Sequence, residues 1–284
     1  MIVVTAASGR LGRAVAAEIQ KLVKPSEVRL AARSPEKIAD LAAQGFPTVR
    51  GDYADRASLE KAFAGAHVVL LISGVSANEQ RIQEHRNAVD AARAARVKRV
   101  VYTSYGNPTP ASLFPFAAIH GDTEAYLKAS GLEYTILRNG PYAANLDGPL
   151  TQSKTNDLLA SPAADAKVAY ITHADAAAAA VGALLGAGHE GKTYEVTGPE
   201  AVTLHDIGAV LSTARGTKVN VAKSALADLR AYFQSLKMPL FLVEALVGSS
   251  AATAAGEYAK VTGDAAKLAG RPTQSMREYV KKFA

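Results

Sequence analysis

The 284-residue chain contains no cysteine, so it forms no disulfide and offers no thiolate nucleophile, zinc ribbon or iron–sulfur ligand. It also lacks any window close to the roughly 18 uninterrupted apolar residues of a membrane-spanning helix. The N-terminus has no basic stretch and no signal-peptide pattern. We therefore expect a cytoplasmic protein without a membrane partner.

Several functional signatures are missing as well. The six histidines show no H-x-x-x-H or other metal spacing, so we expect no metal. There is no G-x-S-x-G elbow, and hence no hydrolase signal. The formal net charge is +6, but the basic residues are scattered singly among acidic ones. A nucleic-acid footprint would be a basic stripe interleaved with aromatic residues. We expect no nucleic-acid partner, although a modest positive field suits an anionic dinucleotide.

Short β-branched runs alternate with segments of helical spacing over the first half of the chain. Most of these runs are almost continuously apolar, as expected of strands that are covered on both faces. The predicted strands are residues 2–5, 28–32, 48–50, 68–72, 100–103 and 134–137, and the predicted helices are 11–23, 35–43, 57–63, 80–95 and 121–130. This alternation predicts an α/β fold with a doubly wound parallel Rossmann sheet.

The rhythm changes after about residue 140. Strands are expected at 168–172 and 193–196 around an alanine-rich helix at 174–185, and Thr203 begins a capping pattern that opens a further helix. Residues 224–258 are typical of helices, and 277–283 of a short amphipathic helix. No Gly/Ser/Pro linker separates these parts. We predict a Rossmann domain over 1–140, integrated with residues 141–284, which hold the remaining sheet elements and a small, mostly helical lobe covering a substrate.

The strongest motif follows the first predicted strand and opens a helix. Here Gly9 lets the backbone approach a pyrophosphate, Gly12 lets the helix pack closely on the sheet, and the helix N-terminus supplies amide donors. Ala6 stands where the G-x-x-G-x-x-G pattern has its first glycine. The strand–turn–helix context predicts a dinucleotide site that includes Ala6, Ser8, Gly9, Arg10, Leu11 and Gly12.

The end of the second predicted strand decides between NAD and NADP. An NAD site has Asp or Glu there, to bind the ribose 2′-hydroxyl. This chain has Arg33 and Ser34. A guanidinium suits a 2′-phosphate, and Arg10 lies on the same rim. Alternatively, Arg33 is a surface residue and Ser34 only a helix cap. With no acidic residue present, we predict NADP(H) as the cofactor.

Two further strand ends fit the same site. Asp52 and Tyr53 follow the third predicted strand, where Asp52 either accepts from the adenine amine or caps a helix that begins near residue 54. Ser73 and Gly74 follow the fourth, where a ligand would cross the strand ends.

Ordinary short-chain dehydrogenases carry a Tyr-x-x-x-Lys pair, whose tyrosine donates a proton to the substrate carbonyl. This pair is absent here, because none of the eleven tyrosines has a lysine four residues later. At the corresponding place stand His120 and Glu124, which share a helix face and serve either in catalysis or as a structural ion pair. Hydride addition to a ketone leaves an alkoxide that demands a proton donor, since its basicity is near that of hydroxide (about 15.7 for water). Addition to a quinone leaves a phenolate-like anion with a pKa of about 10. The site therefore favours quinones or cationic acceptors over simple ketones.

A family resemblance extends over nearly the whole chain. Its motifs are the glycine loop, Arg33, Gly51-Asp52-Tyr53, Leu70-Leu71-Ile72-Ser73, His85-Arg86-Asn87, Tyr102-Thr103-Ser104, residues 120–124, 134–140 and 188–194, and Gly270-Arg271-Pro272. Together they resemble the atypical short-chain dehydrogenases of the NmrA-like group. Within that group the chain is most similar to the bacterial type 2 NAD(P)H:quinone oxidoreductases, followed by the triphenylmethane-dye reductases.

This resemblance implies an NADPH-binding Rossmann domain, a small C-terminal lobe and a cleft where a quinone meets the nicotinamide. It implies that Asn139, Gly140 and Pro141 line the nicotinamide end, with Tyr105 and His120 nearby. Thr103 and Ser104 complete the expected cofactor set. The chain departs from the pattern at Ala6, and at Pro141, where a bulky aromatic residue would fit a flat quinone.

Two functions fit these observations. The first is hydride transfer from NADPH to a quinone or similar conjugated acceptor, catalysed mainly by orientation, with Tyr105, His120, Glu124 and Asn139 as the candidate catalytic residues. The second is a non-catalytic NADP(H) sensor, whose affinity for a partner depends on the cofactor redox state. A sensor needs a partner surface, for which the sequence carries no signal. We predict an enzyme with a small-molecule, quinone-like substrate, and a homodimer is one expectation for its assembly.

Overall fold

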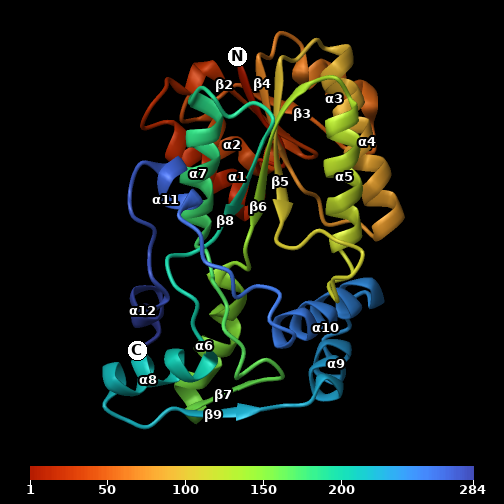
Figure 1. The fold of residues 1–284 in the computed structure, drawn as a ribbon. Coiled ribbons are helices and arrows are strands. Elements are labelled where there is room, and N and C mark those ends of the chain that lie inside the picture. The colour runs from red at the N-terminus through yellow and green to blue at the C-terminus, as the bar shows by residue number, and fades with distance from the viewer.

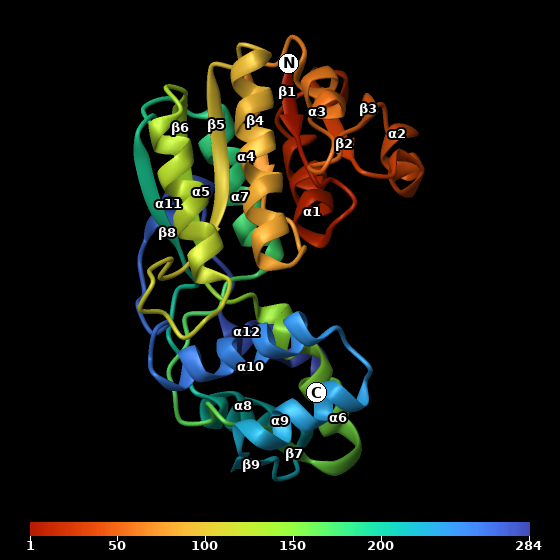
Figure 2. The same cartoon turned by 90° about the vertical axis from the view of Figure 1, so that its right-hand side faces the viewer.

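A computed structural model describes residues 1–284 and arranges them as two lobes, one built around a parallel sheet and one made mostly of helices (Figure 1). The N-terminus lies at the amino edge of the sheet, and the C-terminus lies in the helical lobe. The carboxyl edge of the sheet faces the helical lobe, as the view turned by 90° also shows (Figure 2). No helix combines the length and the apolar character needed to cross a membrane.

The main sheet has seven strands, all parallel, in the order β3-β2-β1-β4-β5-β6-β8. The strands are β1 (Ile2–Val4), β2 (Val28–Ala32), β3 (Thr48–Arg50), β4 (Val68–Ile72), β5 (Arg99–Tyr105), β6 (Glu133–Asn139) and β8 (Lys192–Val196). The chain direction across the sheet reverses between β1 and β4, which is where ligands bind in such sheets. The predicted doubly wound α/β fold is confirmed.

Helices cover both faces of this sheet. On one face lie α1 (Arg10–Ile19), α7 (His173–Leu185), α11 (Asp264–Ala269) and the short α2 (Ala39–Ala42), and on the other lie α3 (Arg56–Phe63), α4 (Asn78–Ala94) and α5 (Ala117–Ala129). Central strands are therefore buried on both sides: every residue of β4 is buried, whereas the edge strand β3 has none that is. Double coverage explains why the central strands are continuously apolar in sequence.

The helical lobe contains α6 (Asp147–Asn156), α8 (Leu204–Arg215), α9 (Leu226–Ser235), α10 (Leu240–Ala254) and α12 (Met276–Tyr279). Thr203 caps α8, and Asp206 returns a bond to the Thr203 backbone, as the capping pattern predicts. Short 3-10 turns occupy Pro25–Glu27, Pro35–Ile38, Ala143–Leu146 and Val280–Phe283.

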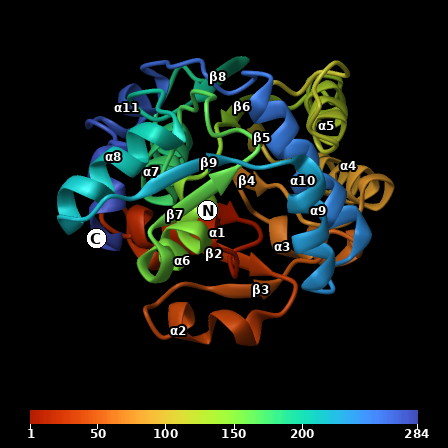
Figure 3. The ribbon, with the colours of Figure 1, turned by 90° about the horizontal axis from the view of Figure 1, so that it is seen from below.

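The strand predicted at residues 193–196 is present as β8, but the strand predicted at 168–172 was wrong. Residues 168–172 form only two isolated bridges, Tyr142 with Ile171 and Val168 with Val202. Their apolar pattern reflects burial between the lobes, not membership of a sheet. Conversely, β7 (Leu158–Ser161) and β9 (Asn220–Lys223) pair in parallel as a small second sheet, visible from below in Figure 3. Both are four residues long and largely exposed, so they leave little periodic signal.

Candidate functional site

A cavity of about 480 Å³ lies at the carboxyl edge of the main sheet, across the reversal between β1 and β4. Its wall includes two of the four catalytic candidates, Tyr105 and His120. It also includes every cofactor-binding candidate except Gly140 and Pro141, namely Ala6, Ser8, Gly9, Arg10, Leu11, Gly12, Arg33, Asp52, Tyr53, Ser73, Gly74, Thr103 and Ser104. We call the part formed by residues 6–12, 33 and 52 the glycine-loop end, and the part formed by Tyr105, Phe116 and His120 the aromatic end.

The loop between β1 and α1 is shaped by backbone constraints. Ala6 has φ 48°, in the left-handed region that favours glycine, so the alanine costs about 1 kcal/mol there. A Cβ on Gly12 would lie 2.6 Å from the Ala6 carbonyl oxygen, so only glycine lets the helix approach the loop. Gly9 caps α1, and no side chain accepts from the first helical amides. These amides and the helix dipole form a site suited to a pyrophosphate.

Two arginines at the glycine-loop end are exposed and form no ion pair. Arg33 follows β2 directly, and Arg10 is the first residue of α1. The neighbouring Arg13, in contrast, is bound to Asp40 at 2.8 Å and is not available to a ligand. The Ser34 side chain makes no capping bond, and Pro35 begins the following turn. Arg33 therefore lines the cavity without a partner in the protein, and its assignment to the 2′-phosphate of NADP stays a prediction.

The Asp52 side chain forms hydrogen bonds within and next to the loop after β3 and does not cap a helix. Its carboxylate accepts from the Ala54 amide at 3.1 Å and from the Arg50 guanidinium at 3.2 Å. Helix α3 begins at Arg56 and is capped by Asp55, which accepts from the Ser58 amide. Asp52 thus lies in the cavity wall, and its predicted hydrogen bond with the adenine amine stays a prediction.

The Tyr53 hydroxyl is committed within the protein. It lies 2.5 Å from Thr5 Oγ1 and donates to the Ile72 carbonyl at 2.6 Å. Burial raises the pKa of this phenol, so the group stays neutral. Only the ring of Tyr53 is left to contact a ligand, while the hydroxyl ties β1 to β4.

A buried histidine holds the loop after β4. The Gly74 amide donates to His85 Nε2 at 3.2 Å, and His85 Nδ1 lies 2.8 Å from Thr123 Oγ1. Thr123 itself donates to the Ile119 carbonyl, so the hydrogen on His85 is assigned to Nδ1. Burial lowers the pKa of His85 to about 3, which keeps it a neutral acceptor. Sequence reasoning had noted the His85-Arg86-Asn87 motif without this role.

His120 lies at the aromatic end, beneath Tyr105. The two rings are stacked, with centroids 6.0 Å apart, and His120 Nδ1 lies 2.8 Å from the Tyr102 hydroxyl. His120 Nε2 has no partner within the protein. Burial, and secondly the charge of Arg81, lower the pKa of His120 to about 3. The imidazole is therefore neutral and can offer one hydrogen bond to a ligand.

Glu124 and Asn139, two of the catalytic candidates, lie outside the cavity wall. Glu124 does not pair with His120; it accepts from the Ser104 hydroxyl at 2.8 Å and from two Arg138 nitrogens at 2.9 and 2.7 Å. Asn139 donates to the Tyr142 hydroxyl at 2.9 Å. Both residues tie neighbouring elements together, since their polar groups point into the protein.

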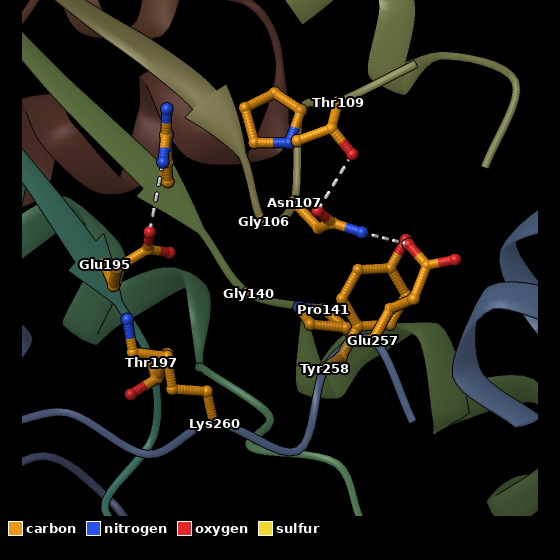
Figure 4. A pocket seen from close by; sticks show the side chains of 12 residues that line it. Gly106, Asn107, Thr109, Gly140, Pro141, Glu195, Thr197, Glu257, Tyr258 and Lys260 are labelled. Carbon is orange, nitrogen blue, oxygen red and sulfur yellow. Dashed lines mark hydrogen bonds and ion pairs between the residues drawn. The ribbon is translucent and has the colours of Figure 1, made fainter. Parts of the chain in front are cut away.

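Gly140 and Pro141 line a second cavity of about 240 Å³, beyond the ends of β6 and β8 (Figure 4). Glu195 lies on one side of this cavity and Asn107 on the other. The Tyr258 ring also lines it and packs edge-on against Tyr105, with centroids 5.5 Å apart. This aromatic contact lies between the two cavities, because Tyr105 lines the first and Tyr258 the second.

Sequence reasoning missed four residues of the main cavity that matter chemically. Tyr142 and His173 stack with centroids 4.2 Å apart and 15° between their planes. His173 falls between the strand expected at 168–172 and the helix expected at 174–185, and it is the first residue of α7. Arg81 and Phe116 form a cation–π pair, with the guanidinium carbon 4.0 Å from the ring centre. None of the four belongs to a recognisable motif, because each pair joins segments that are distant in sequence.

Comparisons with known proteins agree with this architecture. Residues 6–186 match the family described as NAD(P)H-binding. Quinone oxidoreductase 2 of Escherichia coli is 37% identical over 99% of this chain and 97% of its own length. The crystal structure of that enzyme with NADPH superposes with a TM-score of 0.93 over 99% of each chain. Triphenylmethane reductase of Citrobacter sp., solved with NADP(H), is 32% identical and also reaches 0.93, over 100% of this chain and 99% of that one.

A more distant structure shares the fold alone. The transcriptional regulator NmrA, solved with NADP, is 17% identical, with a TM-score of 0.77 over 99% of this chain and 94% of that one. The chain belongs to the NAD(P)H-binding, NmrA-like family of Rossmann proteins. The predictions of this family, of a nicotinamide cofactor and of an enzyme of the quinone-reductase type are confirmed.

Proposed function

We propose that the protein is an NADPH-dependent reductase that transfers a hydride to a quinone or a similar conjugated acceptor. The reaction consumes NADPH, the quinone and one proton, and yields NADP⁺ and the hydroquinone. Bound NADPH supplies the hydride, which carries both electrons and one hydrogen. The acceptor is left as a monoanion that takes its second proton from solvent.

The observation that carries this proposal is the continuity of the main cavity. One space joins a pyrophosphate-binding loop to a wall of Tyr105, Phe116 and His120. A dinucleotide bound across the carboxyl ends of these parallel strands, with its pyrophosphate at the glycine loop, would have its nicotinamide toward this aromatic end. A flat acceptor held there would meet the nicotinamide face, and orientation alone can supply a large part of the rate enhancement.

The side chains at the aromatic end suit an acceptor that needs no strong acid. His120 is neutral and hydrogen-bonded on one side, so its Nε2 contributes one hydrogen bond. A phenolate-like product with a pKa of about 10 forms without prior protonation, whereas an alkoxide does not. Tyr105 is not a rival acid, because burial raises its pKa well above that of free tyrosine.

Preference for NADPH over NADH follows from Arg33 and Arg10. Both guanidiniums border the glycine-loop end and have no carboxylate partner. A 2′-phosphate would offer them charge-assisted hydrogen bonds that NADH cannot make.

The test is anaerobic oxidation of NADPH, with NADH in parallel, by the purified protein and a panel of simple quinones. We expect turnover that prefers NADPH. Tight binding of NADP(H) without turnover on any acceptor would overturn the reductase and favour the sensor role. At present no feature of the site favours that role, since likeness to the NmrA regulator is confined to the fold.

A further inference from the structure

Arg81 is a buried cation without an ion pair. It lies in the first turn of α4 and is only 2% exposed. Its Nε donates to the Ser76 carbonyl at 2.9 Å, and Nη2 contacts the same oxygen. Two other arginines with side chains only 9% exposed are paired: Arg99 with Glu190 and Arg215 with Asp157, each at 3.3 Å or less. A buried charge left unpaired costs several kcal/mol, so Arg81 calls for an explanation.

The position of Arg81 points to the acceptor and not to the phosphates of the nucleotide. Its guanidinium lies over the Phe116 ring at 4.0 Å, and both residues line the cavity with His120. Phe116, which the guanidinium covers, is the residue before α5, and His120 lies in the first turn of that helix. The phosphate-binding residues, in contrast, lie on β1, α1 and β2 at the opposite end of the cavity.

Glu84, three residues later on α4, also lines the cavity; its charge acts on the pKa of Arg81, but the two side chains form no ion pair. Glu84 accepts from the Ser76 hydroxyl at 2.7 Å and from Gln80 at 2.8 Å. Its Oε2 lies 3.7 Å from where a Cβ on Gly74 would be, and beside Tyr53, which is the nucleotide side. The Arg81–Glu84 couple is therefore oriented, with the positive charge toward Phe116 and the negative charge toward the nucleotide.

We propose that Arg81 makes the site selective for acceptors that carry a negative charge, such as quinones bearing an ionised sulfonate, carboxylate or hydroxyl group, and unfavourable for cationic dyes. The inference rests on the proposed reductase function and names its substrate class. Arginine has five N–H donors, and only two are used within the protein. The remaining donors can also stabilise the charge that hydride transfer places on the acceptor oxygen.

The kinetic test compares 1,4-naphthoquinone-2-sulfonate with unsubstituted 1,4-naphthoquinone in the wild-type protein, Arg81→Gln and Arg81→Lys. We expect the ratio of the two kcat/KM values to fall at least tenfold in Arg81→Gln and to be largely kept in Arg81→Lys. Reduction of a cationic triarylmethane dye should rise relative to naphthoquinone in Arg81→Gln. Arg93→Gln is the control, because it removes the same charge from the exposed side of the same helix.

A binding measurement separates this inference from the proposed function. The NADP⁺-saturated protein is titrated with naphthalene-2-sulfonate and with the neutral naphthalene-2-sulfonamide. We expect the sulfonate to bind more tightly to the wild type, and Arg81→Gln to weaken only the sulfonate, about tenfold. Absence of quinone turnover would overturn the proposed reductase function, but the comparison of sulfonate with sulfonamide binding would still test Arg81.

Two results would overturn the role of Arg81. One is an equal loss of affinity for both ligands in Arg81→Gln, which would mean that the residue only holds the loop at Ser76 in place. The other is equal affinity of the wild type for sulfonate and sulfonamide, a result that needs no variant and so does not depend on whether Arg81→Gln folds.

Discussion

The glycine-loop end and the aromatic end of the cavity are built in different ways. The first is one continuous segment, residues 6–12, whose function lies in backbone amides and in the space left by Gly12. The second collects side chains from α4, the end of β5 and the start of α5, held by contacts such as Arg81 on Phe116. A site made of backbone amides allows few residue types at its fixed positions. A site made of side chains can change its chemistry by single substitutions.

This difference separates cofactor binding from acceptor choice. Quinone oxidoreductase 2 and triphenylmethane reductase are named for different acceptors, although the first was solved with NADPH and the second with NADP(H). A glycine-loop end that binds the cofactor and an aromatic end that contacts the acceptor would account for such a difference. Substitutions at the two ends should therefore have separable effects.

The largest effect is expected for Gly12→Val. The new side chain would collide with the Ala6 carbonyl and the Ala7 Cα, which lie 2.6 and 2.7 Å from a Cβ. We expect NADPH affinity to fall more than 100-fold, measured by fluorescence titration, with a lower melting temperature. Gly148→Ala is the control, since nothing lies within 4 Å of its Cβ position. Normal NADPH binding by Gly12→Val would contradict the packing argument.

A second substitution asks whether Glu124 belongs to the aromatic end at all. Glu124→Gln removes the charge that pairs with Arg138 in a buried setting. Breaking a buried pair costs about 3 kcal/mol, so the free energy of unfolding should fall by this order in urea titrations. The kcat with a quinone should stay within about twofold at a temperature where the variant is folded. A hundredfold loss of kcat in the folded variant would restore Glu124 as a catalytic candidate; Glu133→Gln, at an exposed carboxylate, is the stability control.

A smaller and more selective effect is expected for Arg33→Ala. The Kd of NADPH should rise about 100-fold, or about 2.7 kcal/mol, because a charge-assisted contact with the 2′-phosphate is lost. The Kd of NADH should change little. Lys24→Ala removes an exposed positive charge away from the cavity and should alter neither value. An equal loss for both nucleotides would refute the assignment of Arg33 to the 2′-phosphate.

Much of the fold could be predicted because its signals are local. The buried run of β4 and the capping residues of α8 follow from rules that act over a few neighbouring residues. Residues 168–172 misled the prediction because a strand and a buried extended segment have the same apolar pattern. The pair β7–β9 was missed because short exposed strands are defined by their partner, which is 62 residues away for Leu158 and Asn220.

The nucleotide-binding class of this protein follows from local sequence alone, since a pyrophosphate site needs glycine spacing, a strand and a helix start in one short segment. Local sequence also points to Arg33, which follows β2 directly. Contacts between distant segments, in contrast, pair Glu124 with Arg138 and bury Arg81 in the cavity wall without an ion pair. The physical reason is that a charge acquires its pKa and its role from the groups packed around it, and these groups come from distant segments of the chain.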